Sequence, residues 1–138
     1  MEVLSSRTLI HPADLQRSLD FYGDGLGLAV AYEFGEGDHR GTVYFAGNGL
    51  VEVVGRADPP TGPSPVALWL QVRSAAAAVA ELEERGVAVD RGPVLEPWGL
   101  IEAWVHDPDG HRIHLVEVPP GHPLRRDPRS PDTMAVDL

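Results

Sequence analysis

Residues 11–22 read HPADLQRSLDFY, and this stretch sets the first helix of the chain. Leu15, Leu19 and Tyr22 recur at the spacing that places apolar side chains on one face of a helix. Asp14 precedes them, and its carboxylate can accept hydrogen bonds from the free N–H groups of the first turn. The stretch therefore predicts an amphipathic helix that begins just after Asp14.

A second stretch of the same kind follows after a regular interval. Ser74 can cap it as Asp14 caps the first, which gives an offset of 60 residues between the two helix starts. Gly27 and Gly86 follow the two helices at an offset of 59, and glycine readily adopts the left-handed conformation that ends a helix. The chain is therefore predicted to contain an internal repeat.

The second half of each repeat has the pattern of a β-hairpin. Gly47-Asn48-Gly49 separates two β-prone runs, and Asn-Gly favours a tight turn because both residues tolerate positive φ. Asp107-Pro-Asp-Gly110 separates two further runs and has the residues of a proline-initiated turn. Helices and hairpins in the same order predict an α+β fold of two tandem βαβββ modules.

The expected elements follow from these signals. In the first module, residues 1–55, strands are expected near 4–10, 28–34, 40–46 and 50–55, with a helix near 13–24. In the second, residues 66–118, strands are expected near 66–72, 88–96, 101–106 and 112–118, with a helix near 74–85. Residues 1–118 are expected to form one domain, with a proline-rich linker at 56–65 and a surface arm at 119–138.

Three stretches resemble the vicinal-oxygen-chelate superfamily, which contains glyoxalases, bleomycin-resistance proteins and dioxygenases. They are HPADLQRSLDFY with Leu26-Gly27 after it, GLVEV at 49–53 and DPDGHRIH at 107–114. The resemblance implies that the mixed sheets of the two modules curl and enclose one small-molecule cavity. It also implies a homodimer.

The resemblance further implies four metal-ligand positions, which fall on Arg7, Glu52, Ala67 and His114. Only Glu52 and His114 carry a donor for a divalent cation, since arginine stays protonated and alanine has no donor atom. His11 shares the strand face of Arg7 but lies four residues, roughly 13 Å, further along. A catalytic metal normally takes about three protein ligands, so we expect no resident metal. The alternative is a divalent ion on Glu52 and His114, with His11 as a third ligand.

Several of these side chains have other expected roles. Arg7 is a candidate ion-pair partner for Glu52, because a carboxylate that faces an apolar pocket needs one. Glu52 and His114 are the candidate catalytic residues if the protein is an enzyme, because either can move a proton. His111, beside the second turn, is expected to be exposed.

Three tryptophans suit a flat hydrophobic or aromatic ligand. Trp69 lies two residues after Ala67 on the same expected strand, so their side chains should face the same cavity. Trp104 is expected across from His114, and Trp98 lies in a loop that is expected to cover the mouth of the pocket. The predicted ligand-binding set is Arg7, His11, Glu52, Trp69, Trp98, Trp104 and His114.

Composition excludes several other functions. The formal net charge is −10 over 138 residues, which disfavours a nucleic-acid partner. Cysteine is absent, and all 11 basic residues are arginine, so disulfides, thiolate sites and lysine Schiff bases are excluded. No apolar run of membrane-spanning length and no export signal is found, and a cytoplasmic location is expected.

The sequence thus favours a metal-free binding protein of the bleomycin-resistance type. It would sequester a hydrophobic or aromatic small molecule, as in antibiotic resistance. The alternative is a metal-dependent lyase or isomerase related to glyoxalase, or a dioxygenase. A third hypothesis is a metal-free enzyme that uses Glu52 or His114 as its base.

Overall fold

A computed structural model of the chain describes residues 1–55 and 64–125, so most of the expected linker and the last part of the expected arm lie outside the described residues. The chain divides into two compact units. Unit 1 contains Met1–Val66 and His106–His111, and unit 2 contains Ala67–Val105 and Arg112–Leu138. The hairpin turn at 107–110 therefore belongs to unit 1, although it connects two strands of the second sheet.

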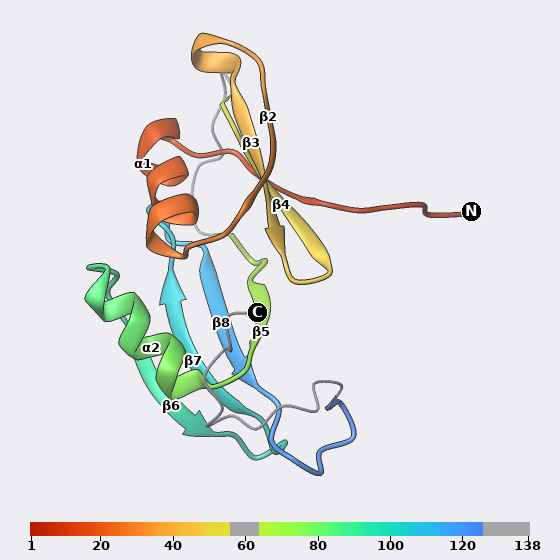
Figure 1. Ribbon diagram of the computed structural model, residues 1–138, viewed down its shortest axis with the longest axis vertical. Coiled ribbons are helices and arrows are strands. Elements are labelled where there is room, and N and C mark those ends of the chain that lie inside the picture. The colour runs from red at the N-terminus through yellow and green to blue at the C-terminus, as the bar shows by residue number, and fades with distance from the viewer. Residues whose placement is uncertain (56–63, 126–138) are drawn as a thin grey trace, which may run out of the picture. The chain divides into compact units, whose positions relative to one another are not determined.

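Unit 1 has a curled four-stranded mixed sheet in the order β1-β4-β3-β2 (Figure 1). Strand β1 pairs with β4 in parallel, and the other neighbours are antiparallel. The elements are β1 Thr8–Ile10, α1 Leu15–Asp20, the π-helical turn η1 Phe21–Gly25, β2 Val30–Phe34, the 3₁₀ turn η2 Gly37–His39, β3 Gly41–Ala46 and β4 Gly49–Val54.

The first helical segment begins after Asp14 and is followed by a left-handed Gly27, as the sequence indicates, but its second half is not α-helical. The Asp14 carboxylate accepts a hydrogen bond from Arg17 N at 3.0 Å, and Gly27 has φ 73°. Between them the helix widens, because Leu26 N donates to Phe21 O, five residues back, at 2.7 Å. The expected α-helix at 13–24 is therefore α only to Asp20.

Strand alternation separates two faces of this sheet. Val51 and Val53 of β4 are buried on the side that α1 covers. Glu52 lies between them and points to the other side, together with its cross-strand partners Leu9 and Val43. We call this second side the open face of the first sheet.

The hairpin between β3 and β4 has a two-residue loop, with Ala46 opposite Gly49. Gly47 has φ 60°, whereas no non-glycine residue in the described chain has positive φ. The turn lies where the sequence predicts it and has glycine at its first central position, as in type II′, so its two loop residues are Gly47 and Asn48.

Unit 2 repeats the arrangement with the order β5-β8-β7-β6, and β5 pairs with β8 in parallel. Its elements are β5 Leu68–Val72, α2 Ala75–Glu84, β6 Arg91–Leu95, β7 Ile101–His106 and β8 Arg112–Glu117. Ser74 caps α2 by accepting from Ala77 N at 3.2 Å, and Gly86 has φ 78°. The prediction of two βαβββ modules with curled mixed sheets is confirmed, and each sheet is open.

Two edge strands are shorter than expected. Strand β1 begins at Thr8 rather than near residue 4. Strand β6 spans only Arg91–Leu95, and its register shifts between Arg91 and Val94. Pro93 lies in this irregular segment, and proline cannot donate a ladder hydrogen bond.

No helix among residues 1–55 and 64–125 is long and apolar enough to cross a membrane.

Candidate functional site

An ion pair lies on the open face of the first sheet. Arg7 Nη1 is 2.9 Å from Glu52 Oε1 and also donates to Tyr32 Oη at 3.2 Å. The Arg7 guanidinium lies 5.6 Å from the centre of the Tyr32 ring. Hydrogen bonds to Tyr32 and Glu52 raise the pKa of Arg7, so this residue is a permanent cation. The expected Arg7–Glu52 pair is thus present.

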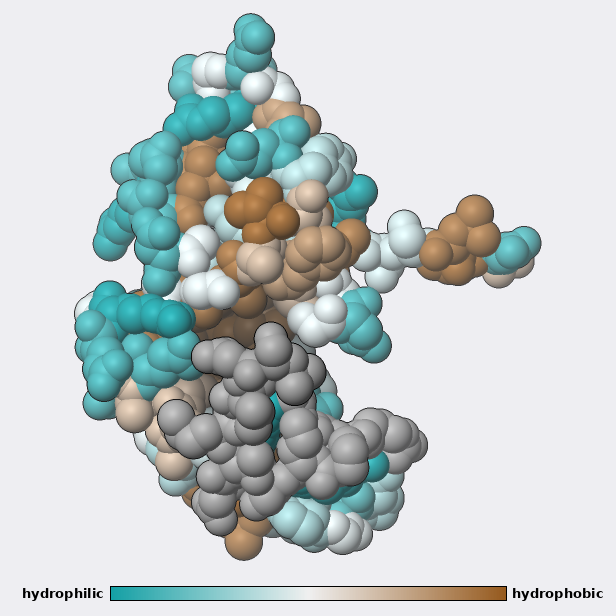
Figure 2. All heavy atoms as spheres, in the orientation of Figure 1, coloured by the Kyte–Doolittle hydropathy of each residue, from teal (hydrophilic) through white to brown (hydrophobic). Residues whose placement is uncertain are grey.

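Apolar side chains surround this pair. Leu9, Tyr32 and Phe45 share its face by strand pairing and are each about half exposed, at 49%, 48% and 52%. Figure 2 shows hydrophobic residues gathered over the strands of unit 1, beside the hydrophilic surface of α1. The open face of the first sheet is therefore an accessible apolar surface with one polar pair set into it.

His11 follows the end of β1. Its Nδ1 is buried and has no hydrogen-bond partner. No hydrogen bond links it to Glu52 within the part of the chain that the structure describes. The structure therefore does not join His11 to the Arg7–Glu52 pair by a hydrogen bond.

Three rings form a row on the open face of the second sheet, the face opposite α2. Trp69 of β5 is the cross-strand partner of His114 of β8. The His114 ring lies 5.4 Å from the ring of Trp104 on β7, as the sequence predicts. Trp69 is half exposed, and a quarter of the His114 side chain is accessible. This face therefore presents aromatic surface from three adjacent strands.

Glu102 fixes the orientation of His114. Its Oε1 lies 3.0 Å from His114 Nδ1, and its Oε2 accepts from Trp98 Nε1 at 2.7 Å. Burial alone would raise the pKa of Glu102, but the hydrogen bonds from His114 and Trp98 outweigh it and hold that pKa below its ordinary value. An ionised Glu102 keeps the proton of His114 on Nδ1, which leaves Nε2 as the atom available to a ligand.

Sequence reasoning did not include Glu102 in the site. Strand alternation could have found it, because Glu102 lies two residues before Trp104 and must share its face. Its 4% exposure, which a charged side chain rarely has without partners, was not visible in the sequence.

Two arginines flank Trp104. The guanidinium carbon of Arg91 lies 3.7 Å from the centre of the Trp104 ring, and that of Arg112 lies 4.5 Å from it. Arg91 is also ion-paired with Glu96 and donates to Glu102 O. Neither arginine was predicted to belong to the site.

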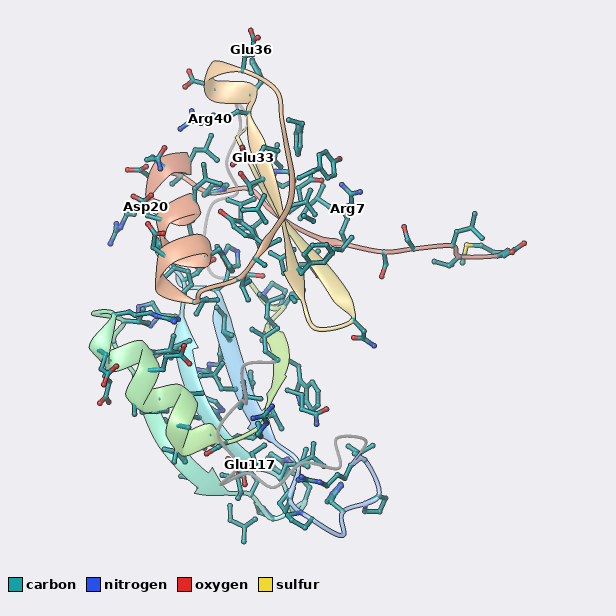
Figure 3. All side chains as sticks on the ribbon, viewed as in Figure 1. Arg7, Asp20, Glu33, Glu36, Arg40 and Glu117 are labelled. Atoms are coloured by element: carbon teal, nitrogen blue, oxygen red, sulfur yellow. The ribbon has the colours of Figure 1, made fainter. Side chains whose placement is uncertain are left out.

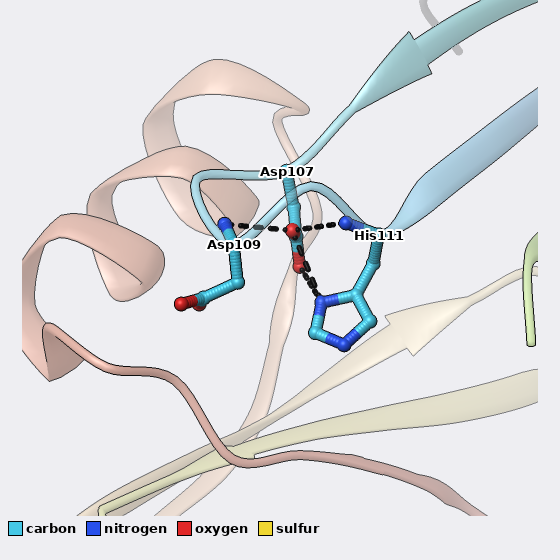
Figure 4. A group of neighbouring side chains, drawn as sticks. All are labelled: Asp107, Asp109 and His111. Carbon is cyan, nitrogen blue, oxygen red and sulfur yellow. Dashed lines mark hydrogen bonds and ion pairs between the residues drawn. The ribbon is translucent and has the colours of Figure 1, made fainter. Parts of the chain in front are cut away.

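A separate polar cluster organises the turn after β7. The fully buried Asp107 accepts from Tyr22 Oη at 2.8 Å. It also accepts from the backbone N of Asp109 and of His111, at 3.0 and 2.9 Å (Figure 4). His111 Nδ1 lies 2.9 Å from Asp107 Oδ2. The expectation that His111 is exposed is wrong, because this contact draws its ring to the buried carboxylate and leaves the side chain 19% exposed.

Asp107, Asp109 and His111 offer ligand atoms within 4.8 Å of one another and are close enough to share a metal ion. The hydrogen bonds that these residues already make do not suit a metal ion. Asp107 already accepts from one O–H and two backbone N–H groups and contacts the His111 ring, while Asp109 accepts from Ala13 N at 3.1 Å. A cation would have to displace these donors, so the cluster fits a turn that is held by a buried carboxylate.

The implied metal-ligand positions also fit an ion poorly. Glu52 and His114 carry donors, but Glu52 is bonded to Arg7, and Arg7 and Ala67 cannot ligate.

A cavity of about 720 Å³ lies between the first helix and strands β2 and β3 of unit 1. Leu19 and Asp20 line it from α1, Glu33 from β2 and Tyr44 from β3, and Arg40 lines it from the residue just before β3. Figure 3 shows Asp20, Glu33 and Arg40 here, whereas Arg7 lies on the side of the sheet away from α1. The cavity is thus distinct from the predicted site.

Two curled, open sheets, each built as βαβββ, define the class of protein as a vicinal-oxygen-chelate fold. The chain belongs to the Glyoxalase/Bleomycin resistance protein/Dioxygenase superfamily, whose family model matches residues 6–115.

Relatives in this superfamily include both enzymes and binding proteins. The lactoylglutathione lyase of Escherichia coli O157:H7 is 32% identical over 121 residues, which cover 80% of this chain and 89% of that protein. The crystal structure of TnmS3, an antibiotic binding protein from Streptomyces sp. CB03234, is 25% identical, has a TM-score of 0.71, and is matched over 86% of this chain and 98% of that one. A superfamily member from Sphaerobacter thermophilus is also 25% identical, with a TM-score of 0.70 over 84% and 98% of the two chains.

Proposed function

We propose that the protein is a metal-free binding protein that sequesters a hydrophobic or aromatic small molecule on the open faces of its sheets. The Arg7–Glu52 ion pair is the observation that carries this proposal. It occupies two of the four positions that the family resemblance assigns to metal ligands. In this interpretation a salt bridge replaces half of the metal site.

Electrostatics favours this interpretation. Arg7 donates to one of the two carboxylate oxygens of Glu52, and its positive charge repels a divalent ion at the same place. The Glu52 side chain is only 13% exposed, so its carboxylate depends on this partner for solvation. Removing the arginine would leave this mostly buried carboxylate without its charged partner.

Exposed aromatic residues support a hydrophobic or aromatic ligand. Tyr32 and Phe45 on the first sheet and Trp69 on the second are each about half exposed. Exposed rings next to a few fixed polar groups are typical of small-molecule sites. The similarity to TnmS3, which is described as an antibiotic binding protein, points to the same class of function. A homodimer and a role in antibiotic resistance by sequestration belong to this proposal.

Metal analysis of the purified protein tests it, together with thermal shifts in the presence of Ni²⁺, Zn²⁺, Fe²⁺ or Mn²⁺ and of polycyclic aromatic probes. We expect no stoichiometric metal, no metal-induced shift and a rise in melting temperature with aromatic probes, since a ligand of the folded state stabilises it. Stoichiometric metal that is lost in Glu52→Gln but kept in the exposed control Glu36→Gln would overturn the proposal.

A metal-dependent lyase is the second candidate. The identity to lactoylglutathione lyases and the donor side chains at Glu52 and His114 favour it. A glyoxalase-like isomerase or a dioxygenase would use the same two side chains. Formation of lactoylglutathione that depends on added metal and is lost in both Glu52→Gln and His114→Ala would establish the lyase in place of the binding protein.

A further inference from the structure

The two arginines that flank Trp104 differ in their surroundings. Arg91 is partly buried, is paired with Glu96 and also donates to Glu102 O. Arg112 is exposed, and its guanidinium has no carboxylate and no hydrogen-bond acceptor in residues 1–55 and 64–125. Its contact with the Trp104 ring holds the guanidinium against the open face of the second sheet.

The carboxylates nearby are already engaged. Glu102 accepts from His114 and Trp98, and Glu96 is paired with Arg91. Their side chains are only 5% and 9% exposed. A molecule that approaches this face therefore meets the charge of Arg112 and not those of the two buried acids, although the whole chain has a net charge of −10.

Arg112 lies at one end of the aromatic row. It precedes His114 by two residues on β8, so the two side chains point to the same face. Trp69 lies beside His114 on the next strand and is half exposed. A flat molecule over Trp69 and His114 can thus extend an anionic group toward Arg112.

We propose that the ligand of this face is an aromatic carboxylate, with its carboxylate bound by Arg112 and its ring stacked on Trp69. The planar guanidinium can donate two parallel hydrogen bonds to a carboxylate while it remains stacked on an indole. His114 Nε2, left available by the Glu102 contact, provides a polar atom beside the ring. The inference rests on the proposed binding function and specifies the charge of the ligand.

Isothermal titration calorimetry with 2-naphthoate and its neutral analogue 2-naphthalenemethanol tests this. We expect the wild type to bind naphthoate at least tenfold more tightly. Arg112→Gln should remove that difference and leave the affinity for the alcohol unchanged. Arg85→Gln is the matched control, because it removes the same charge from the residue that follows α2, the helix on the opposite face of the sheet.

The outcomes separate the two proposals. If both probes bind equally well to the wild type, or if Arg112→Gln weakens both equally, the role of Arg112 is refuted while the binding function stands. If neither probe binds to the wild type, both proposals fail. Arg112→Lys keeps the charge but loses the planar fork, so it should retain only part of the preference for naphthoate. Circular dichroism of each variant checks that the fold is intact.

Discussion

Replacing Glu102 by glutamine tests the contact that orients His114. The carboxylate is 4% exposed and accepts hydrogen bonds from both His114 and Trp98. A glutamine of the same size keeps one carbonyl acceptor but turns an NH₂ group toward one of the two donors. Hydrogen bonds to a charged group contribute about 1.5–3 kcal/mol each, so we expect the free energy of unfolding at pH 7 to fall by about 1.5–3 kcal/mol.

The pH dependence of this loss has a definite sign. The pKa of Glu102 in the folded state lies below its ordinary value of 4.5. Its ionised form therefore stabilises the fold above pH 4.5, and this contribution disappears as the pH falls through the folded-state value. The difference between wild type and Glu102→Gln should be largest near neutrality and should shrink in acid.

Urea unfolding followed by tryptophan fluorescence measures both effects, since Trp98 is itself a partner of Glu102. Glu83→Gln, on the exposed side of α2, is the control and should change stability by less than about 0.5 kcal/mol. A Glu102→Gln variant as stable as this control would refute the reasoning. So would a loss of the same size at about pH 3 and at pH 7.

Two further predictions concern unit 1. Burial raises the pKa of Tyr22 well above its ordinary value of 10.0, and the nearby Asp107 carboxylate raises it further. The stabilisation by Tyr22 is therefore complete below pH 10 and is lost as the pH rises beyond that value. Tyr22→Phe should lower the free energy of unfolding at pH 7 by about 1.5–3 kcal/mol. When urea unfolding is repeated at alkaline pH, the variant should lose less stability than the wild type, and an equal loss in the two proteins would contradict this. Gly55→Ala should lower the melting temperature, because the new Cβ would lie 2.0 Å from a backbone oxygen, an overlap that costs about 1–3 kcal/mol or more. Gly92→Ala, where nothing lies within 4 Å, is the control, and equal melting temperatures for the two variants would show that the loop at Gly55 relaxes freely.

The sequence by itself determined the local structure. Asp14 and Ser74 cap their helices, and Gly27 and Gly86 adopt the left-handed conformation after them. These features depend on interactions between near neighbours in the chain, which residue type and spacing encode directly. The repeat of such signals was sufficient to give two βαβββ modules.

Strand parity also placed part of the candidate site. The family resemblance grouped Arg7, Glu52, Ala67 and His114, and parity with Ala67 added Trp69 to the same face, because alternation fixes the direction of a side chain once its strand is known. The structure has the Arg7–Glu52 pair and makes Trp69 the cross-strand partner of His114. The expected contact of Trp104 with His114 followed from the hairpin in the same way.

Tertiary structure alone decided which polar side chains form hydrogen bonds with one another. Glu102 accepts from His114, twelve residues away, and Asp107 accepts from Tyr22, 85 residues away. Such pairs depend on the register of neighbouring strands and on how each buried charge finds its donors, and no periodicity in the chain records them. For the same physical reason the unpaired Arg112 emerged only from the folded sheet, because an arginine is unpaired only relative to the carboxylates that folding brings near it.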